Sequence, residues 1–384
     1  MPATNQNRVY LVQSVERACD VLAAFRKSEA VLHLPDIIRR TGQTKATAFR
    51  VLSTLVSRQV LERAGQSGYR ARFEPLHVNR YRIGYAMQSD VKTFLSTVND
   101  GIMSAAREAN IELFVLNNKA SRVTALRNAN EFVEQKVDLV IEFQLHMAIA
   151  ETLSAKYSQA GIPVITIDAP QPGATFFGAD NYKAGHMGGS FLGRWAATNW
   201  QGRVDQVLCI APRSGFLQAR LVGLLDGLQA VLPLHGRVQV MKYERRPSFE
   251  ISRATVRQQL RHNNPARRVL AAAVNDQSAL GILQGFRDFG REDLCAVVGQ
   301  GAALEARQEM RKRGSRFIGS VGYFPETYGK KIIGLALDIL EKQTVPKIEL
   351  IQHKIIHAQN VDSFYPADSS LTQENQPDNF RRSF

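Results

Sequence analysis

A short stretch near the N-terminus brings cationic, hydroxyl-bearing and small side chains together at helical spacing. It contains Thr44, Lys45, Thr47, Ala48 and Arg50. On the first exposed turn of a helix, such groups can reach base edges and phosphates in the major groove of a duplex. Thr44 is also a suitable N-cap for that helix. The chemistry that this stretch favours is therefore recognition of double-stranded DNA.

The elements that must position these residues are two short helices on either side of a tight turn at residues 41–43. Apolar residues recur at helical spacing in the second helix, where Phe49, Leu52 and Leu55 are expected to face the core. Gly42 stands where a helix C-terminus needs a residue that tolerates positive φ. The pattern predicts a helix-turn-helix, and an ordinary helical hairpin is the alternative.

A helix before this pair and a hairpin after it complete the predicted domain. Ser14 is expected to cap the preceding helix, with Val15 on its buried stripe. The sequence LERAGQSGYRARF reads as two strands around a glycine turn, which predicts a β-hairpin, or wing. Arg63, Arg70 and Arg72 line the wing, where they could bind backbone phosphates or enter the minor groove.

Positive charge is concentrated in the same region. Residues 1–80 carry thirteen Lys and Arg against six Asp and Glu, so this fifth of the chain holds half of the net charge of +14. Such a surplus is the electrostatic footprint of a phosphate-binding surface. A basic domain can also simply be well solvated, so the charge supports the motif without proving it.

The remaining composition excludes several classes of protein. Apolar residues make up 44% and charged residues 22% of the 384 residues, as in soluble globular proteins. There is no apolar run of about 18 residues to span a membrane and no signal-peptide core at the N-terminus, which predicts a cytoplasmic protein. Cys19, Cys209 and Cys295 are far apart, and His353 and His357 lie in a strand-like pattern, so we expect neither a metal site nor a cofactor.

From residue 81 onward, strand and helix signals alternate, which predicts parallel sheets in an α/β fold. Two consecutive series of comparable size suggest two lobes with a cleft between them, and the final strand is expected at Glu349–Ile356. Gln144 follows the strand-like DLVIEF and is a candidate binding residue from its position alone. Residues 74–80 are the expected linker, and the polar tail at 367–384 is expected to be disordered.

Residues 12–73 resemble the winged helix-turn-helix of IclR-type transcriptional regulators. The resemblance is carried by SVERACDVLAAF, LPDIIRRTGQTKATAFRVLSTLVSRQVLER and GYRARF, which occur in the family's order. That family usually has a proline where this chain has Thr44. It also continues into its own effector-binding domain, which this chain does not show. The resemblance implies an N-terminal, mainly α-helical domain that binds DNA.

Residues 81–366 resemble the type I periplasmic-binding-protein fold, shared by sugar-binding proteins and by the effector domains of LacI-type repressors. The motifs that carry the likeness are GIPVITIDAP, FFGADNYKAGHMGG, ARLVGLLDGLQAVL, AAAVNDQSALGILQGFRDFG and SVGYFPETYGKK. By this resemblance, one lobe holds about 81–181 and 324–352. The other holds about 182–323 and 353–366, with the ligand in the crevice at the carboxyl ends of the strands.

The same resemblance implies which residues bind the ligand. Phe94 matches an aromatic residue that covers a sugar ring, and the other candidates are polar: Asp168, Arg220, Asn275, Asp276 beside it, and Tyr323. Each has a plainer reading. Asp168 and Asn275 could cap the segment after their strands, Phe94 could be core, and Arg220 could face a surface carboxylate.

Departures from the family pattern widen the range of ligands. Asp168 is followed by Ala169 where sugar-binding relatives often have arginine, and Gln300 stands where many have aspartate. Fewer charges weaken the case for a simple pentose and leave other sugars, polyols and small polar metabolites open.

The function expected from both halves is a ligand-responsive transcriptional regulator, such as a repressor, that binds DNA as a homodimer or higher oligomer. One alternative is the solute-binding protein of a transport system, against which the missing signal sequence and the basic N-terminal domain argue. Another is an α/β enzyme. Its nearest phosphate-loop candidate, Gly299-Gln300-Gly301, lacks the third glycine of a dinucleotide fingerprint.

Overall fold

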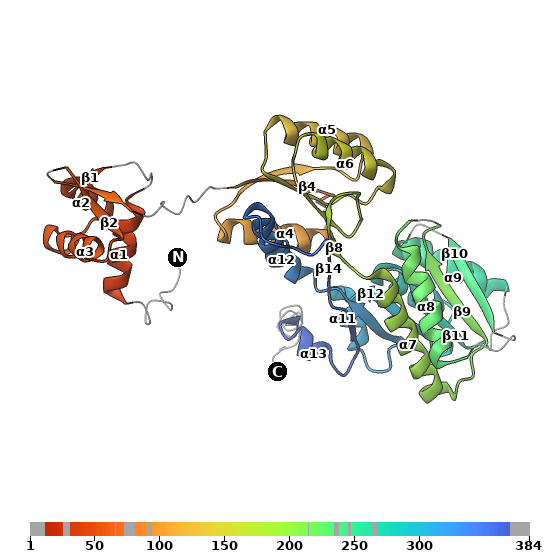
Figure 1. Ribbon diagram of the computed structural model, residues 1–384. Coiled ribbons are helices and arrows are strands. Elements are labelled where there is room, and N and C mark those ends of the chain that lie inside the picture. Colours follow the sequence, from red (N-terminus) through yellow and green to blue (C-terminus); the bar gives the residue numbers. More distant parts are fainter. Residues whose placement is uncertain are drawn as a thin grey trace, which may run out of the picture. The chain divides into compact units, whose positions relative to one another are not determined.

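The computed structural model divides the chain into two compact units, residues 1–81 and 82–384, which are described separately (Figure 1). The structure describes residues 12–25, 31–65, 67–72, 81–90, 94–213, 215–233, 238–244, 247–262 and 267–368. The linker expected at 74–80 lies outside these residues. So does the tail from 369 onward.

The helices of the N-terminal unit are α1 (Gln13–Ala23), α2 (Leu34–Thr41) and α3 (Lys45–Ser57). Gly42 ends α2 with φ of +66°, and its N–H donates to the Ile38 carbonyl, as glycine at a helix C-terminus should. Thr44 caps α3 by accepting a hydrogen bond from the Thr47 N–H at 3.3 Å. The predicted helix-turn-helix is confirmed.

A three-stranded antiparallel sheet packs beside these helices. Its order is β1 (Leu32–His33), β3 (Gly68–Ala71) and β2 (Leu61–Ala64). The predicted hairpin is β2–β3, in which Leu61 pairs with Ala71 and Ala64 with Gly68. The short strand β1 was not predicted from the sequence, because two residues carry no periodicity.

Two expectations about buried residues in this unit are wrong. The buried side of α3 consists of Ala48, Leu52 and Leu55, whereas the side chain of Phe49 is 47% exposed. Ala48 starts an i, i+4, i+7 stripe, and Phe49 lies about 100° further round the helix. In α1 the N-cap is Val12 instead of Ser14, and Val15 is 57% exposed.

The second unit is a two-lobed α/β fold, as predicted. Its first lobe is built on a parallel six-stranded sheet, with α5 (Arg122–Glu134) and α6 (Ala150–Gln159) on one face. The helices α4 (Phe94–Glu108) and α12 (Tyr328–Leu340) lie on the other (Figure 1). The strands are, in sheet order, β14 (Ile348–Leu350), β8 (Thr175–Gly178), β7 (Val164–Ile167), β6 (Leu139–Glu142), β4 (Arg82–Met87) and β5 (Glu112–Asn117).

The second lobe is built on another six-stranded sheet, which is parallel except for its last strand. The strands are, in sheet order, β10 (Gln239–Glu244), β9 (Gln206–Ala211), β11 (Val269–Ala273), β12 (Cys295–Gly301), β13 (Phe317–Gly322) and the antiparallel β15 (Lys354–Ile356).

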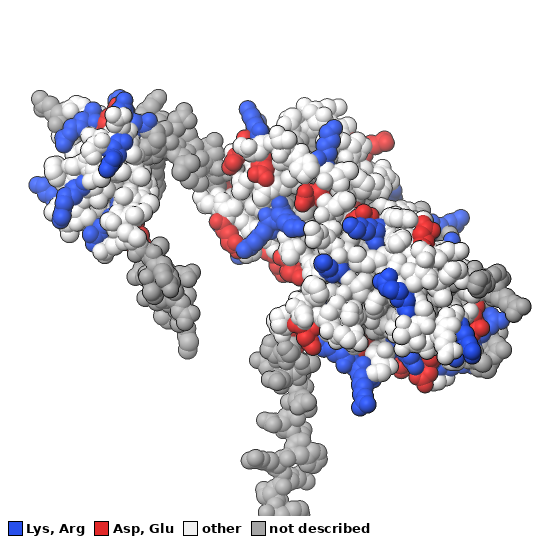
Figure 2. Space-filling view, turned by 60° about the horizontal axis from the view of Figure 1, so that its bottom comes forward, with Lys and Arg blue, Asp and Glu red and all other residues white. Residues whose placement is uncertain are grey.

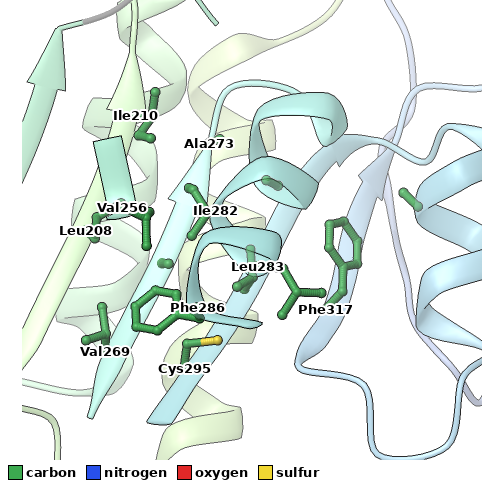
Figure 3. Packing of buried hydrophobic residues seen from close by; sticks show 14 of the residues in the cluster. Leu208, Ile210, Val256, Val269, Ala273, Ile282, Leu283, Phe286, Cys295 and Phe317 are labelled. Atoms are coloured by element: carbon green, nitrogen blue, oxygen red, sulfur yellow. The ribbon is translucent and has the colours of Figure 1, made fainter. Parts of the chain in front are cut away.

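Helices cover both faces of this second sheet. One face carries α7 (Asn181–Trp200) and α8 (Gln218–Val231). The opposite face carries α9 (Phe249–His262) and α10 (Asp276–Arg287), whose side chains Val256, Ile282 and Phe286 pack onto strand residues such as Leu208 (Figure 3). The shorter helices α11 (Leu304–Met310) and α13 (Val361–Phe364) add to this side.

The chain passes between the two lobes at three places. It leaves β8 for α7, returns from β13 to α12, and runs from β14 to β15. The final strand predicted at Glu349–Ile356 is therefore wrong. It is two strands that belong to different sheets. The strands β8 and β13 and the helix α7 were also not predicted, and α7 contains glycines that lower its intrinsic helix propensity.

The end of the described chain is also more ordered than expected. The tail was predicted to begin at 367, but Asp368 is buried against α11. Its carboxylate accepts hydrogen bonds from Nε and Nη2 of Arg307 at 2.6 and 2.9 Å, and from Arg311 Nη1 at 3.0 Å. A bidentate, buried ion pair of this kind fixes residues that composition alone would leave unstructured.

The glycines of α7 allow the backbone of this helix to touch the backbone of α8. A Cβ atom added at Gly185 or Gly189 would collide with the carbonyl groups of Arg220 or Leu224, and α8 presents Gly223 to α7 in the same way. Helices normally pack 8–10 Å apart through side chains. Here glycine removes those side chains, so α8 is held at a fixed distance from α7.

We expect Gly189→Ala to destabilise the second unit by about 3 kcal/mol, because neither helix backbone can move away without disrupting the core. Gly334→Ala in α12 is the matched control: an added Cβ there meets nothing within 4 Å, so it should stabilise the fold by about 0.5–1 kcal/mol. Denaturant unfolding of both variants measures these changes. Equal effects would contradict the backbone contact.

Candidate functional site

Several of the predicted ligand residues meet where strands of the two sheets end. Asp168 follows β7, Asn275 follows β11, and Tyr323 follows β13, while Arg220 projects from the first turn of α8. Carboxyl ends of parallel strands form the usual ligand crevice of open α/β sheets.

Arg220 is the most firmly held of these residues. Its Nε donates to Asn181 Oδ1 at 2.6 Å and its Nη1 donates to the Val274 carbonyl at 2.7 Å. The guanidinium carbon also lies 4.7 Å from the centre of the Tyr323 ring, in cation–π geometry. Because Asn181 begins α7 and Val274 follows β11, the closely packed pair α7–α8 decides where this positive charge sits.

Aromatic rings border the same place. The Tyr323 hydroxyl donates to Gln300 Oε1 at 2.9 Å, and Gln300 Nε2 donates to the Ala184 carbonyl at 3.3 Å. Phe94, at the start of α4, is half-buried and meets the rings of Tyr323 and Tyr328 edge-on, with centroids 6.4 and 5.6 Å away. The structure thus brings Phe94, Tyr323 and Arg220 together.

Asp168 supplies a buried carboxylate. It is 7% exposed, and its Oδ1 accepts a hydrogen bond from the Ala179 N–H at 3.1 Å. Burial raises its pKa to about 6, although the positive charge of Arg220 and the Ala179 hydrogen bond both act in the opposite direction. Its backbone has φ of +59°, a conformation that non-glycine residues seldom adopt and that often marks functional positions.

Two other buried carboxylates are occupied by groups of the protein itself. Glu142, at the end of β6, accepts from Asn118 Nδ2 at 3.1 Å and from the Tyr157 hydroxyl at 2.9 Å. Burial raises its pKa to about 7 despite these bonds. The Asp276 carboxylate accepts from the Ser320 hydroxyl and the Ala303 N–H, both at 2.6 Å.

Asn275 and Asp276, both expected to bind a ligand, also have hydrogen-bond partners within the protein. Asn275 caps α10, with its Oδ1 accepting from the Ser278 N–H at 2.9 Å, which is the alternative left open from the sequence. Asp276 is 2% exposed, and its carboxylate ties the start of α10 to Ser320 of β13 and to Ala303, the N-cap of α11. The amide nitrogen of Asn275 remains the group of this pair that can serve a ligand.

Gln144 is 2% exposed, and its Oε1 accepts from the His146 N–H at 2.9 Å. Within the described chain its Nε2 has no hydrogen-bond partner, and neither has Nε2 of the buried His353. Burial lowers the pKa of His353 to about 4, and its ring meets that of Tyr323 with centroids 4.8 Å apart. The amide Nε2 of Gln144 is a donor, whereas Nε2 of the neutral His353 ring is an acceptor, because Nδ1 carries the proton that faces the Gly322 carbonyl at 3.4 Å. Buried polar atoms without partners cost stability unless a ligand or water binds them.

Sequence reasoning missed two residues of this group. Gln300 could have been found, because it lies near the end of β12, at the position where the resemblance noted from the sequence led us to expect aspartate. His353 carried no such signal: it lies in the passage from β14 to β15, which the sequence predicts as one continuous strand.

The N-terminal unit presents its basic residues outward. Lys45 and Arg50 are exposed on α3, and Thr47 is half-buried beside them. Ala48 does not belong to this surface: its exposed fraction is 0%, because it packs into the core of the unit. Figure 2 shows Lys and Arg side chains spread over the described part of this unit, with few acidic side chains between them.

The arginines of the predicted wing are exposed as well. Arg70 and Arg72 lie 3.5 and 3.6 Å from the carboxylate of Glu62, and Arg63 lies 5.4 Å from the centre of the Tyr69 ring. Surface ion pairs at such distances contribute little to stability. Arg70 and Arg72 could therefore leave Glu62 for an anion such as phosphate with little loss of folding free energy.

Comparison with known families matches this description. Residues 83–344 match the periplasmic binding protein domain, and residues 14–65 match the IclR helix-turn-helix domain. The chain belongs to the periplasmic-binding-protein domain family and carries an IclR-type helix-turn-helix ahead of that domain. Both resemblances predicted from the sequence are confirmed, and neither matched domain is that of an enzyme. Comparison with curated proteins finds no match.

Solved structures share the fold at low sequence identity. An ABC transporter solute-binding protein from Agrobacterium vitis with bound allitol aligns with a TM-score of 0.65 and 17% identity, over 75% of this chain and 98% of that one. A counterpart from Bacillus halodurans with bound myo-inositol gives 0.63 and 18%, over 75% and 98%. Another, from Actinobacillus succinogenes with bound D-allose, gives 0.63 and 17%, over 74% and 99%.

The described residues show neither a membrane-spanning helix nor a metal site. No described helix combines the length and apolar character needed to cross a membrane. Nor does any group of His, Cys, Asp and Glu among those residues have the arrangement of a metal site.

The raised pKa of Asp168 predicts that Asp168→Asn stabilises the protein at neutral pH. The folded state disfavours the ionised carboxylate. The contribution of Asp168 to the free energy of unfolding is therefore fully present below pH 4, where the acid is protonated in both the folded and the unfolded state, and it is lost as the pH rises through 6. Asparagine imitates the protonated form. The variant should gain up to about 3 kcal/mol over the wild type at pH 8 and little at pH 4.

Denaturant unfolding at pH 4, 6 and 8 measures this difference. Asp338→Asn, which removes an exposed carboxylate from α12, is the matched control. If both variants follow the wild type with the same pH dependence, Asp168 is not the strained carboxylate that its burial indicates.

Proposed function

We propose that this protein is a ligand-responsive transcriptional regulator. Its N-terminal unit binds double-stranded DNA and its two-lobed domain binds a small sugar or polyol. The observation that carries the proposal is the combination in one chain of an IclR-type helix-turn-helix with a periplasmic-binding-protein domain. The exposed cations Lys45 and Arg50 on α3 support the first half, since phosphates and base edges need such groups.

The polar residues of the crevice support a neutral, hydroxyl-rich ligand. Asp168, Arg220 and the amides of Asn275 and Gln144 are the planar groups that bind vicinal hydroxyls. Phe94 offers an aromatic face for the C–H surface of the ligand, and Tyr323 orients Arg220 through its ring. The relatives with bound allitol, myo-inositol and D-allose are consistent with this class.

We further propose that closure of the lobes on the ligand changes DNA binding by the N-terminal unit. Ligand binding would favour the conformation with closed lobes over the one with open lobes. The affinity for DNA would change because the two conformations bind DNA differently. The proposed boundaries are those expected from the sequence: a DNA-binding domain at 12–73, a linker at 74–80 and a ligand domain at 81–366. A homodimer in the cytoplasm, similar in its effector domain to LacI-type repressors, completes the proposal, because paired half-sites raise affinity.

The second candidate function is solute binding for a transport system, which the similar solved structures favour by their titles. The helix-turn-helix domain favours regulation over it, since a transport receptor has no use for exposed α3 cations. DNA binding by the full chain distinguishes the two.

We expect Arg50→Ala and Lys45→Ala each to weaken binding to the DNA upstream of the protein's own gene by at least tenfold. Each removes a charged contact, so the slope of log K against log salt should fall by about one for a phosphate contact. Gel shift and fluorescence anisotropy at several salt concentrations measure both effects. Lys330→Ala, which removes an exposed charge from α12, is the control and should bind normally. Unchanged affinity in the α3 variants would reject this DNA-binding surface.

We expect one or more of allitol, myo-inositol and D-allose to raise the unfolding temperature of the second unit, because a ligand at a hundred times its Kd adds about 2.7 kcal/mol. Asp168→Asn and Arg220→Lys should abolish this shift and leave DNA binding intact. Asp338→Asn should keep the shift. A response retained in both crevice variants would place the ligand elsewhere.

A further inference from the structure

Phe49 is a large apolar residue on the outer side of α3. Its exposed fraction is 47%, while Ala48, Leu52 and Leu55 form the buried side of the same helix. The core of the N-terminal unit is therefore complete without the Phe49 ring. A single exposed apolar residue is common on protein surfaces, but this one lies on the helix that carries Lys45 and Arg50.

Its neighbours on the helix are the groups already assigned to DNA. Lys45 lies four residues before Phe49 and Arg50 directly follows it, and both are exposed. Residues four apart share one side of a helix, so Lys45 and Phe49 stand one above the other on the outward face. Ala46, three residues before Phe49, is exposed on the same face and adds no bulk.

We propose that Phe49 reads the 5-methyl group of a thymine in the major groove. This inference rests on the proposed DNA binding and names a specificity residue within it. Thymine is the base that presents a methyl group in that groove, and an apolar side chain is the partner that favours it. The residues at the start of a recognition helix are those that reach base edges.

Lys45, Arg50 and Phe49 would then recognise different groups of the DNA. Lys45 and Arg50 offer hydrogen-bond donors, which bind phosphates or the acceptors of guanine and cannot recognise a methyl group. Phe49 has no donor or acceptor, so its contribution disappears when the methyl group is removed and the rest of the base is kept. Removal of the methyl group would hardly change the binding contribution of Lys45 or Arg50.

The test uses full-length protein and a duplex that the wild type selects from a random DNA library. Each thymine of the bound site is replaced in turn by deoxyuridine, which removes only the methyl group, and Kd is measured by anisotropy. We expect one or two positions at which the wild type loses about five- to tenfold. Phe49→Ala should bind the thymine duplex about as weakly as the wild type binds the deoxyuridine duplex. Its affinity should not fall further when deoxyuridine replaces thymine. Phe49→Leu should keep part of the methyl sensitivity.

Val123→Ala on α5 is the matched control, since it truncates a 79% exposed apolar residue of the other unit and should keep the full methyl sensitivity. Equal deoxyuridine losses in wild type and Phe49→Ala would overturn the inference while leaving DNA binding established. So would a change in oligomeric state by sedimentation in Phe49→Ala, because the ring would then contact a second copy of the chain. If the wild type selects no duplex, the proposed function fails and this inference with it.

Discussion

The backbone contact between α7 and α8 is the constraint on which the crevice depends. Gly185 and Gly189 face carbonyl groups of α8 with no side chain between them. Arg220, in the first turn of α8, donates a hydrogen bond to Asn181, the first residue of α7, so the packing of the two helices sets the position of its guanidinium. A site built on rigid helices holds a charge more accurately than one built on loops. The glycines thus fix the place of the Arg220 guanidinium through packing.

The buried carboxylates show how the same chemical group takes different roles. Glu142 and Asp276 each have two or more protein donors, and both stabilise the inside of a lobe. Asp168 has one hydrogen bond to the Ala179 N–H and a backbone in the left-handed region. A buried acid with so few donors is costly for the free protein. The proposed ligand would offset this cost, because its hydroxyl groups would supply the missing donors.

The N-terminal unit follows the opposite principle, because its functional residues are those that the fold leaves exposed. A small core around Val21, Phe25, Ile37 and Leu52 holds three helices and a short sheet together. Lys45 and Arg50 are exposed around this core, while Arg70 and Arg72 share the carboxylate of Glu62 on the surface. The two units therefore place their polar groups differently: Asp168 and Tyr323 are buried in the second unit, whereas Lys45 and Arg50 are exposed in the N-terminal unit.

The sequence by itself determined the α/β alternation and the helix-turn-helix around Gly42 and Thr44, because periodicity and helix caps are properties of neighbouring residues. Asp168 and Arg220 were named as candidates only through the family resemblance. Tertiary structure decided the rest. Residues 348–356 divide between two sheets because partners far away in the chain pair with β14 and β15. The helix α7 is glycine-rich, and α8 packs closely against it. Ala48 is buried and Phe49 exposed because two apolar stripes were possible on α3, and only the neighbouring elements select between them.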